Sequence, residues 1–149
     1  MIPNVKASEQ AAILGAIAPS SQAVGTLNSG WVSVAKFNKL LAVIATGVLG
    51  AAATVDAKFQ QAMDGAGTGA KDVAGAAIAQ IVKATGDNTQ AEINLDPQQL
   101  DVANGFAYVQ LTVTVGTAAS QTAALLMGFT PRFAPASDFN AASVKQIVG

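Results

Sequence analysis

The chain has 149 residues, of which eight are basic and nine acidic, and it contains neither histidine nor cysteine. These counts exclude imidazole and thiolate catalysis, disulfides, and zinc sites built from histidine or cysteine. The net charge is −1, and Arg132 is the single arginine, so a clustered basic patch for nucleic acid is excluded as well.

Charged residues make up 11% of the chain and hydrophobic residues 51%. A soluble domain usually carries about a quarter charged residues. A surface this poor in charge suits contact with other proteins, because small uncharged side chains cost less to desolvate than lysine or glutamate. The composition therefore indicates a structural or binding protein without a cofactor rather than an enzyme, and the length fits one domain.

The N-terminal dozen residues are predicted to form a short arm. The apolar run 11–18 could belong to a signal peptide, but Glu9 cancels the charge of Lys6 and the run is short for that purpose. A second apolar run, 40–53, is too short to span a bilayer as a helix. We therefore expect no membrane partner and synthesis in the cytoplasm.

The first predicted strands lie between residues 31 and 61. One begins at 31–37, and the next, 40–48, is apolar on both faces, which is typical of a central or interfacial strand. Residues 53–61 alternate, with Val55, Ala57 and Phe59 as the inner row.

A glycine-rich loop is expected at 64–69, after these strands. A phosphate-binding loop would end in Gly-Lys followed by serine or threonine, whereas Lys71 stands between alanine and aspartate. A hairpin loop is the better interpretation.

Residues 73–83 fit two conformations. Val73, Ala77 and Ile81 share one face of a helix, and alanine favours helix. Ile78, Gln80 and Val82 also fit a strand, and Gly75 weakens a helix. We favour a strand, because the segments on both sides are predicted strands.

Three further strands are predicted at 91–95, 105–115 and 123–129. The segment 105–115 shows the clearest period of two, between turn signals at Asn104-Gly105 and Gly116. Its inner row consists of Ala107, Val109, Leu111, Val113 and Val115. The total of about seven or eight strands predicts an all-β protein, an antiparallel β-sandwich or jelly roll with extended terminal arms.

We assign residues 1–135 to a single sandwich domain and residues 136–149 to a C-terminal arm, with a helical turn at 141–147. The arm has one of two roles: a frayed terminus, or an anchor that docks on another subunit. The second interpretation rests on four apolar candidates for contact: Phe139, Val144, Ile147 and Val148.

Two sets of residues are candidates for chemistry. Paired carboxylates among Asp64, Asp72, Asp96 and Asp101 could serve a glycosidase or bind calcium, although capping and turn roles are the favoured explanation for all four. The aromatic side chains Trp31 and Tyr108 could stack on a sugar, or could anchor a core or an interface.

The order of segments also resembles a known class of proteins. The run SGWVSVAKFNKLLAVIATGVLGAAATVDAKFQQAMDGAGTGAKDV, followed by LDVANGFAYVQLTVTVG and GFTPRFAP, is similar to small virion proteins of tailed bacteriophages, in particular capsid decoration (cement) or minor head proteins. The resemblance extends from about Ala11 to Pro135. It implies an antiparallel sandwich without catalytic residues.

The resemblance further implies a place on the capsid exterior of a virion, with the major capsid protein and copies of the chain itself, as a dimer or trimer, as partners. Two alternatives remain open. A head–tail connector or tail protein would share the composition but often has a charged lumen. A glycan- or receptor-binding module would need an exposed aromatic platform.

Overall fold

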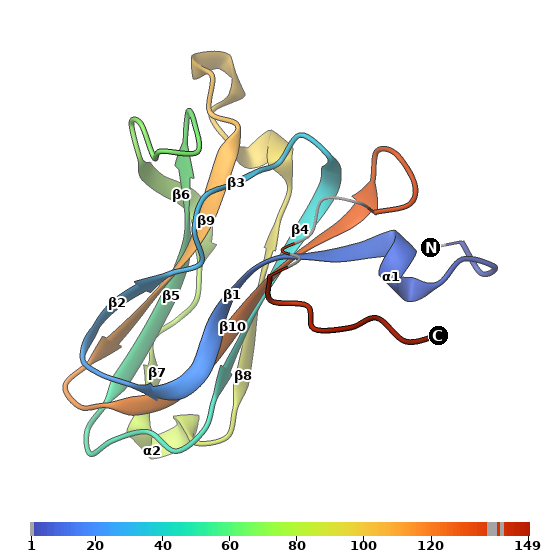
Figure 1. The fold of residues 1–149 in the computed structure, drawn as a ribbon. Helices are drawn as coiled ribbons and strands as arrows, with labels where there is room; N and C mark the ends of the chain where they lie inside the picture. Colours follow the sequence, from blue (N-terminus) through green and yellow to red (C-terminus); the bar gives the residue numbers. More distant parts are fainter. Residues whose placement is uncertain (1, 137–139, 141) are drawn as a thin grey trace.

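The computed structural model describes residues 2–136, 140 and 142–149, and these form two antiparallel β-sheets packed face to face (Figure 1). Sheet A contains four strands in the order β1-β10-β4-β8. Their bounds are Ala11–Gln22, Ser120–Pro131, Phe37–Thr46 and Gln90–Leu95.

Sheet B contains four strands in the order β2-β9-β5-β6, and two short strands pair at its margins, β3 with β9 and β7 with β5. The bounds are β2 Gly25–Asn28, β9 Tyr108–Gly116, β5 Thr54–Ala62, β6 Lys71–Ala77, β3 Val32–Ser33 and β7 Ile81–Val82. The short helices are α1 Ala7–Gln10, α2 Lys83–Gly86, η1 Pro97–Gln99 and η2 Val102–Asn104.

The chain alternates between the two sheets. We count the remaining strands in chain order after leaving out the two-residue strands β3 and β7. In this count, sheet A holds the first, eighth, third and sixth strands, and sheet B holds the second, seventh, fourth and fifth. Only the β5–β6 hairpin joins successive long strands of one sheet within the described residues. This order is a jelly roll, which confirms the predicted all-β class.

The core lies between the inner faces of the sheets. Val55, Ala57 and Phe59 of β5 are buried, as the alternation predicts. The inner row of β9 is likewise confirmed over Val109–Val115, where its apolar members are at most 1% exposed. Residues 105–107 precede the strand, because Gly105 ends η2 in the left-handed conformation.

Strand β1 is the main departure from the sequence-based expectation, since no strand is predicted at residues 11–22 and the predicted arm of about a dozen residues includes its start. The alternation is hidden by a register shift between Ile13 and Gly15, which leaves both Leu14 and Gly15 buried. The short helix α1 and the residues before it are the part of the N-terminal arm that remains.

Three further segments differ in detail. The expected strand at 31–37 is reduced to β3, and Phe37 begins β4. The favoured strand at 73–83 is confirmed in part: β6 ends at Ala77, β7 covers Ile81–Val82, and Lys83 begins α2. In the arm, residues 142–149 contain a turn at 142–143 and no helix, so the helical turn predicted there is wrong; Ala141 lies outside the described residues.

A candidate protein-binding face on sheet A

The outer face of sheet A carries apolar side chains across three adjacent strands. In β10 the outward residues alternate with buried ones, and register brings Leu125 opposite Val43, and Met127 opposite both Leu41 of β4 and Ile13 of β1. We call this surface the apolar face and define it as Ala11, Ile13, Ala16, Leu41, Val43, Ala45, Ala123, Leu125, Met127 and Phe129.

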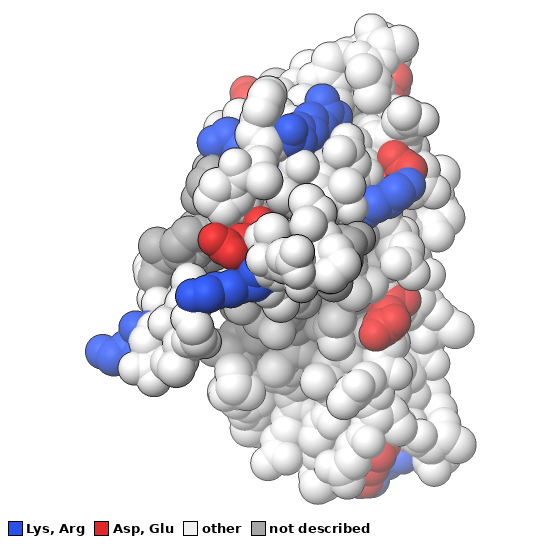
Figure 2. Space-filling view, turned by 90° about the vertical axis from the view of Figure 1, so that its right-hand side faces the viewer, with Lys and Arg blue, Asp and Glu red and all other residues white. Residues whose placement is uncertain are grey.

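The side chains of the apolar face are half-buried, except for that of Leu125, which is 39% exposed. Charge is confined to its margins: Lys39 lies opposite Phe129, and Glu92 of the edge strand β8 lies opposite Val43. Figure 2 views this side of the molecule; the charged atoms lie mostly in its upper half and along its outline, and the lower centre is white. A contiguous apolar surface with a polar rim is typical of a protein interface.

Three open hollows border this face. One of about 700 Å³ lies between the ends of β4 and β8 and includes Leu41, Asn94 and Phe129. A second of about 400 Å³ lies at the opposite end, beside Ala45 and Ala123. The third, of about 280 Å³, lies beside Ile13, Met127 and Val144. The apolar face therefore has a hollow at each end, and a partner's side chains could insert into these hollows.

The outer face of sheet B is different in chemistry. Hydroxyl and amide side chains bond one another across its strands: Thr112 Oγ1 lies 3.0 Å from Asn28 Oδ1, and Gln110 Nε2 donates to Gln60 Oε1 at 3.0 Å. Thr26 and Thr114 pair at 3.2 Å. Because these polar groups bond one another within the chain, the outer face of sheet B is polar and internally bonded, whereas the outer face of sheet A is apolar.

The candidate carboxylates have structural roles. Asp64 accepts hydrogen bonds from the backbone N–H groups of Ala66 and Thr68, and Asp96 caps η1 through Gln98 N–H, as predicted. Hydrogen bonds from Thr68 lower the pKa of Asp64, and Lys39 is the largest cause of the lowered pKa of Asp96.

Of the other two carboxylates, Asp72 departs from the predicted turn and capping roles, whereas Asp101 holds the position before η2 without a side-chain capping bond. Asp72 lies within β6 and pairs with Lys58 at 2.7 Å, which lowers its pKa. Asp101 pairs with Lys71 at 2.5 Å and accepts from Asn104, with the same effect on its pKa. The first pair joins the neighbouring strands β5 and β6, and the second joins β6 to the residue before η2; sequence spacing shows neither contact. The described residues contain no group of three or more acidic side chains placed to hold a metal ion.

The two candidate stacking residues lie beside the glycine-rich loop at 64–69. A Cβ added to Gly67 would be 2.6 Å from Trp31 Nε1, and one added to Gly65 would be 3.5 Å from the Tyr108 ring. Both rings are half-buried. Their contact with the loop fits the anchoring role better than an open platform for a sugar.

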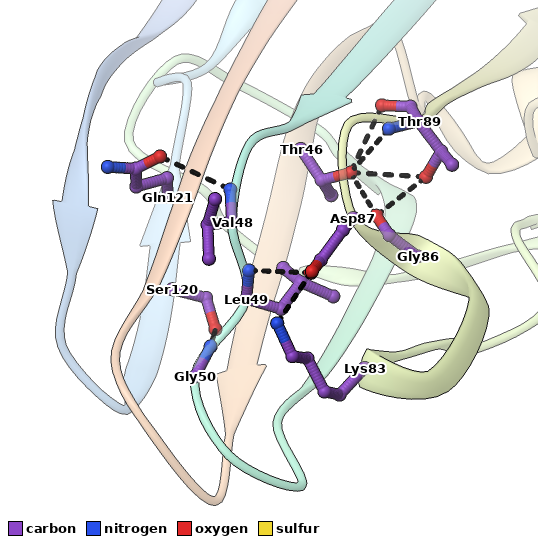
Figure 3. A network of polar contacts seen from close by, with 10 residues as sticks. All are labelled: Thr46, Val48, Leu49, Gly50, Lys83, Gly86, Asp87, Thr89, Ser120 and Gln121. Atoms are coloured by element: carbon purple, nitrogen blue, oxygen red, sulfur yellow. Dashed lines mark hydrogen bonds and ion pairs between the residues drawn. The ribbon is translucent and has the colours of Figure 1, made fainter.

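A polar network closes the end of the sandwich near α2 (Figure 3). Thr46 Oγ1 donates to the Gly86 carbonyl at 2.6 Å, and Asp87 accepts from Leu49 N–H at 2.9 Å and from Lys83 Nζ at 2.6 Å. These bonds hold the connection after β4 against the connection before β8. The hydrogen bonds from Lys83 and Leu49 lower the pKa of Asp87.

The predicted anchors of the C-terminal arm have different surroundings. Val144 is half-buried beside β1 and β10, whereas Ile147 and Val148 are 59% and 83% exposed. Phe139 lies outside the described residues. Sequence reasoning did not name the larger apolar face. The segment 40–48, which is apolar on both faces, indicated it, and the segment 123–129 shows the same two-sided apolar pattern.

Among the described residues, no helix has the length and hydropathy needed to cross a membrane. No protein-family model matches the sequence, and neither does any curated protein. Solved structures with similar folds include one described as CBM4, at 13% identity and a TM-score of 0.43, with 72% of this chain and 61% of that chain covered.

Two other similar structures come from a prophage and a virus. The SPBc2 prophage-derived protein YomS is 9% identical, with a TM-score of 0.40, and 79% of this chain and 91% of that chain are covered. A chain of infectious bursal disease virus Gx strain is 12% identical, with a TM-score of 0.41. The match covers 84% of the present chain and 32% of the viral chain. These distant likenesses concern the arrangement of strands and carry no information on a ligand or partner.

Proposed function

We propose that this chain is a structural protein of a tailed-phage virion, which decorates the outside of the icosahedral capsid and stabilises it by binding the major capsid protein. The apolar face of sheet A is the observation that carries the proposal. A monomer facing water would gain nothing from exposing it, whereas burial against a shell would remove its apolar area from water.

The composition supports an assembled state. Few charges need to be desolvated at the apolar face, because Lys39 and Glu92 lie at its rim. A repeating shell also offers many equivalent sites, so a modest contact per copy becomes effective when neighbouring contacts raise the local concentration. The sequence resemblance to phage decoration proteins points the same way.

The alternatives receive less support from the chain. The chain has eight basic and nine acidic residues, and these 17 charges are too few for a connector with a charged lumen. A glycan-binding module would need open aromatic faces, whereas Trp31 and Tyr108 rest against the loop at 64–69.

The place of the protein in intact particles tests the proposal. Electron microscopy of virions should show its density repeated over the outer shell. Capsids that lack the protein should assemble and then rupture at a lower temperature than decorated ones. Density at the portal or in the tail alone would contradict the proposal and favour the connector.

A further inference from the structure

Strand β8 forms an edge of sheet A, and its backbone is open to a further strand (Figure 1). It pairs with β4 over Gln90–Leu95 without a register shift. The same register continues to Thr46, whose N–H donates to the Thr89 carbonyl at 2.9 Å. The bonding direction alternates along an antiparallel strand, so every second residue from Thr89 onward bonds to β4. The residues between them, which include Glu92 and Asn94, therefore direct their N–H and C=O groups away from β4.

The other sheet edges carry features that hinder such pairing. Strand β1 contains Pro19 and register shifts, and its Ile13 carbonyl accepts from Asn140 N–H. Strand β6 has a register shift against β5 and holds Gly75 at a φ of 75°. Strand β2 is four residues long. Proline, bulges and short length are the usual means by which proteins protect an edge strand, and β8 has none of the three.

The outward side chains of β8 also lack partners. Gln90, Glu92 and Asn94 are exposed, and within the described part of the chain none of the three forms a side-chain hydrogen bond or ion pair. On the outer face of sheet B, by contrast, Gln110 donates to Gln60. A carboxylate that accepts and an amide that donates, two residues apart on an open edge, form a pattern that complements a second copy of itself.

We propose that β8 pairs antiparallel with β8 of a second copy, about a twofold axis at Ile93. The open backbone groups of Glu92 then face those of Asn94 in the second copy, and these two residues exchange their N–H···O bonds. Their side chains lie opposite each other as well, so the Asn94 amide donates to the Glu92 carboxylate. Twofold symmetry forms the same contact on both sides of the axis.

Charge and backbone geometry select this register. An axis at Glu92 would set two carboxylates opposite each other, and an axis at Asn94 would set Glu92 opposite Asp96. An axis at Ala91 would bring Asn88 into the ladder, although its φ is 55° and the strand has not yet begun there. An axis midway between two residues would set open groups of one strand against groups already bonded to β4 in the other.

The pairing joins two copies of sheet A into one larger sheet. Residues directly opposite each other in a ladder project to the same side, so the apolar faces of the two copies lie on one side of this sheet. The inference goes beyond the proposed function, because it identifies a contact between copies that needs no shell.

Cross-linking between single-cysteine variants tests both the pairing and its register, because the native chain has no cysteine. Glu92→Cys and Asn94→Cys are prepared separately, and one of them carries a purification tag, so that products from one variant or from both differ in mass. The thiols are joined by a bis-methanethiosulfonate with a single methylene spacer. Both positions are exposed, so each fold should persist, and circular dichroism checks it.

The mixed product should be at least about threefold more abundant than the product of either variant with itself. Directly opposite Cβ atoms lie about 5 Å apart in a ladder, whereas diagonal ones lie about 7–8 Å apart. A mixture of Glu92→Cys with Val102→Cys reports random collision, because Val102 is 63% exposed and lies in η2. Preferred linkage of one variant with itself would overturn the register, and mixed product no more abundant than in the Val102 mixture would overturn the pairing.

Charge at position 94 provides an independent measurement. Asn94→Lys sets an ammonium opposite Glu92 of the second copy and should strengthen self-association, whereas Asn94→Asp sets two carboxylates opposite each other and should weaken it. Sedimentation velocity over a range of concentrations follows the species of twice the 14.9 kDa chain mass. The two dissociation constants should differ at least about tenfold.

Equal self-association of the lysine and aspartate variants would contradict the pairing. Neither experiment needs a capsid. Edge pairing in a chain that fails to bind capsids would therefore contradict the proposed function and leave the pairing standing.

Discussion

Adjacent residues of β9 have opposite environments. Leu111 is fully buried in the sandwich, and Thr112, on the outer face of sheet B, is 5% exposed and bonds to Asn28 and Gln60. We expect Leu111→Ala to lower the free energy of unfolding by about 2–5 kcal/mol, as a cavity in the core does. Thr112→Ala should cost about 1 kcal/mol, the usual value of a lost hydrogen bond. Denaturant titration measures both, and equal losses would contradict the assignment of faces.

The ionisable residues predict the pH dependence of stability. Hydrogen bonds and lysine partners lower the pKa of Asp64, Asp72, Asp87, Asp96 and Asp101 in the folded chain. A lowered pKa means that the folded state binds fewer protons than the unfolded state, so this stabilisation is complete above the ordinary aspartate pKa of about 4 and is lost as pH falls below it.

Thermal unfolding should therefore change little between about pH 5 and 8, where no histidine titrates, and the melting temperature should fall in acid. Asp96→Asn should reduce the loss in acid, since it removes one of the groups whose pKa is lowered. A melting temperature that rises on acidification from pH 5 to 3 would contradict the assignment.

At the level of elements, the sequence predicts interior strands better than margins. Strands β5 and β9 lie inside sheet B, and their apolar residues recur at every second position over 55–59 and 109–115, so the period of two is visible. Strand β1 has a register shift at Gly15, and β2 is short, so neither shows a clear period. The hollow beside Val144 arises where the consecutive elements α1 and β1 meet β10, which is distant from them in sequence, and no local pattern records it.

The C-terminal element can be tested by truncation. Deleting residues 137–149 should leave the circular dichroism spectrum of the sandwich unchanged, because the described part of the segment contributes one backbone bond to β1 and no strand. The truncated chain should bind capsids more weakly if the segment anchors a neighbour. A truncated chain that unfolds would show that the segment is part of the domain, and undiminished capsid binding would contradict its anchoring role.

For the whole molecule, the two outer faces of the sandwich differ in chemistry, and the proposed function assigns the face of sheet A to the contact with the shell. Sheet B presents polar groups that bond one another, whereas sheet A presents the apolar face with hollows at both ends. The sequence indicated this through the two-sided apolar pattern of 40–48. It could not show that β10 lies beside β4, and β1 beside β10, so that the three strands form one surface, because that order follows from the jelly roll.

Binding of purified protein to capsids that lack it tests the central claim most directly. Leu125→Asp places a charge at the centre of the apolar face, at a side chain already 39% exposed, so the fold should persist. Val102→Asp makes the same kind of change at an exposed position in η2. In co-sedimentation, the Val102 variant should bind like wild type, and the Leu125 variant at least about tenfold more weakly, equivalent to about 1.4 kcal/mol. Equal binding by the Leu125 variant and wild type would contradict the assignment of this face to the shell.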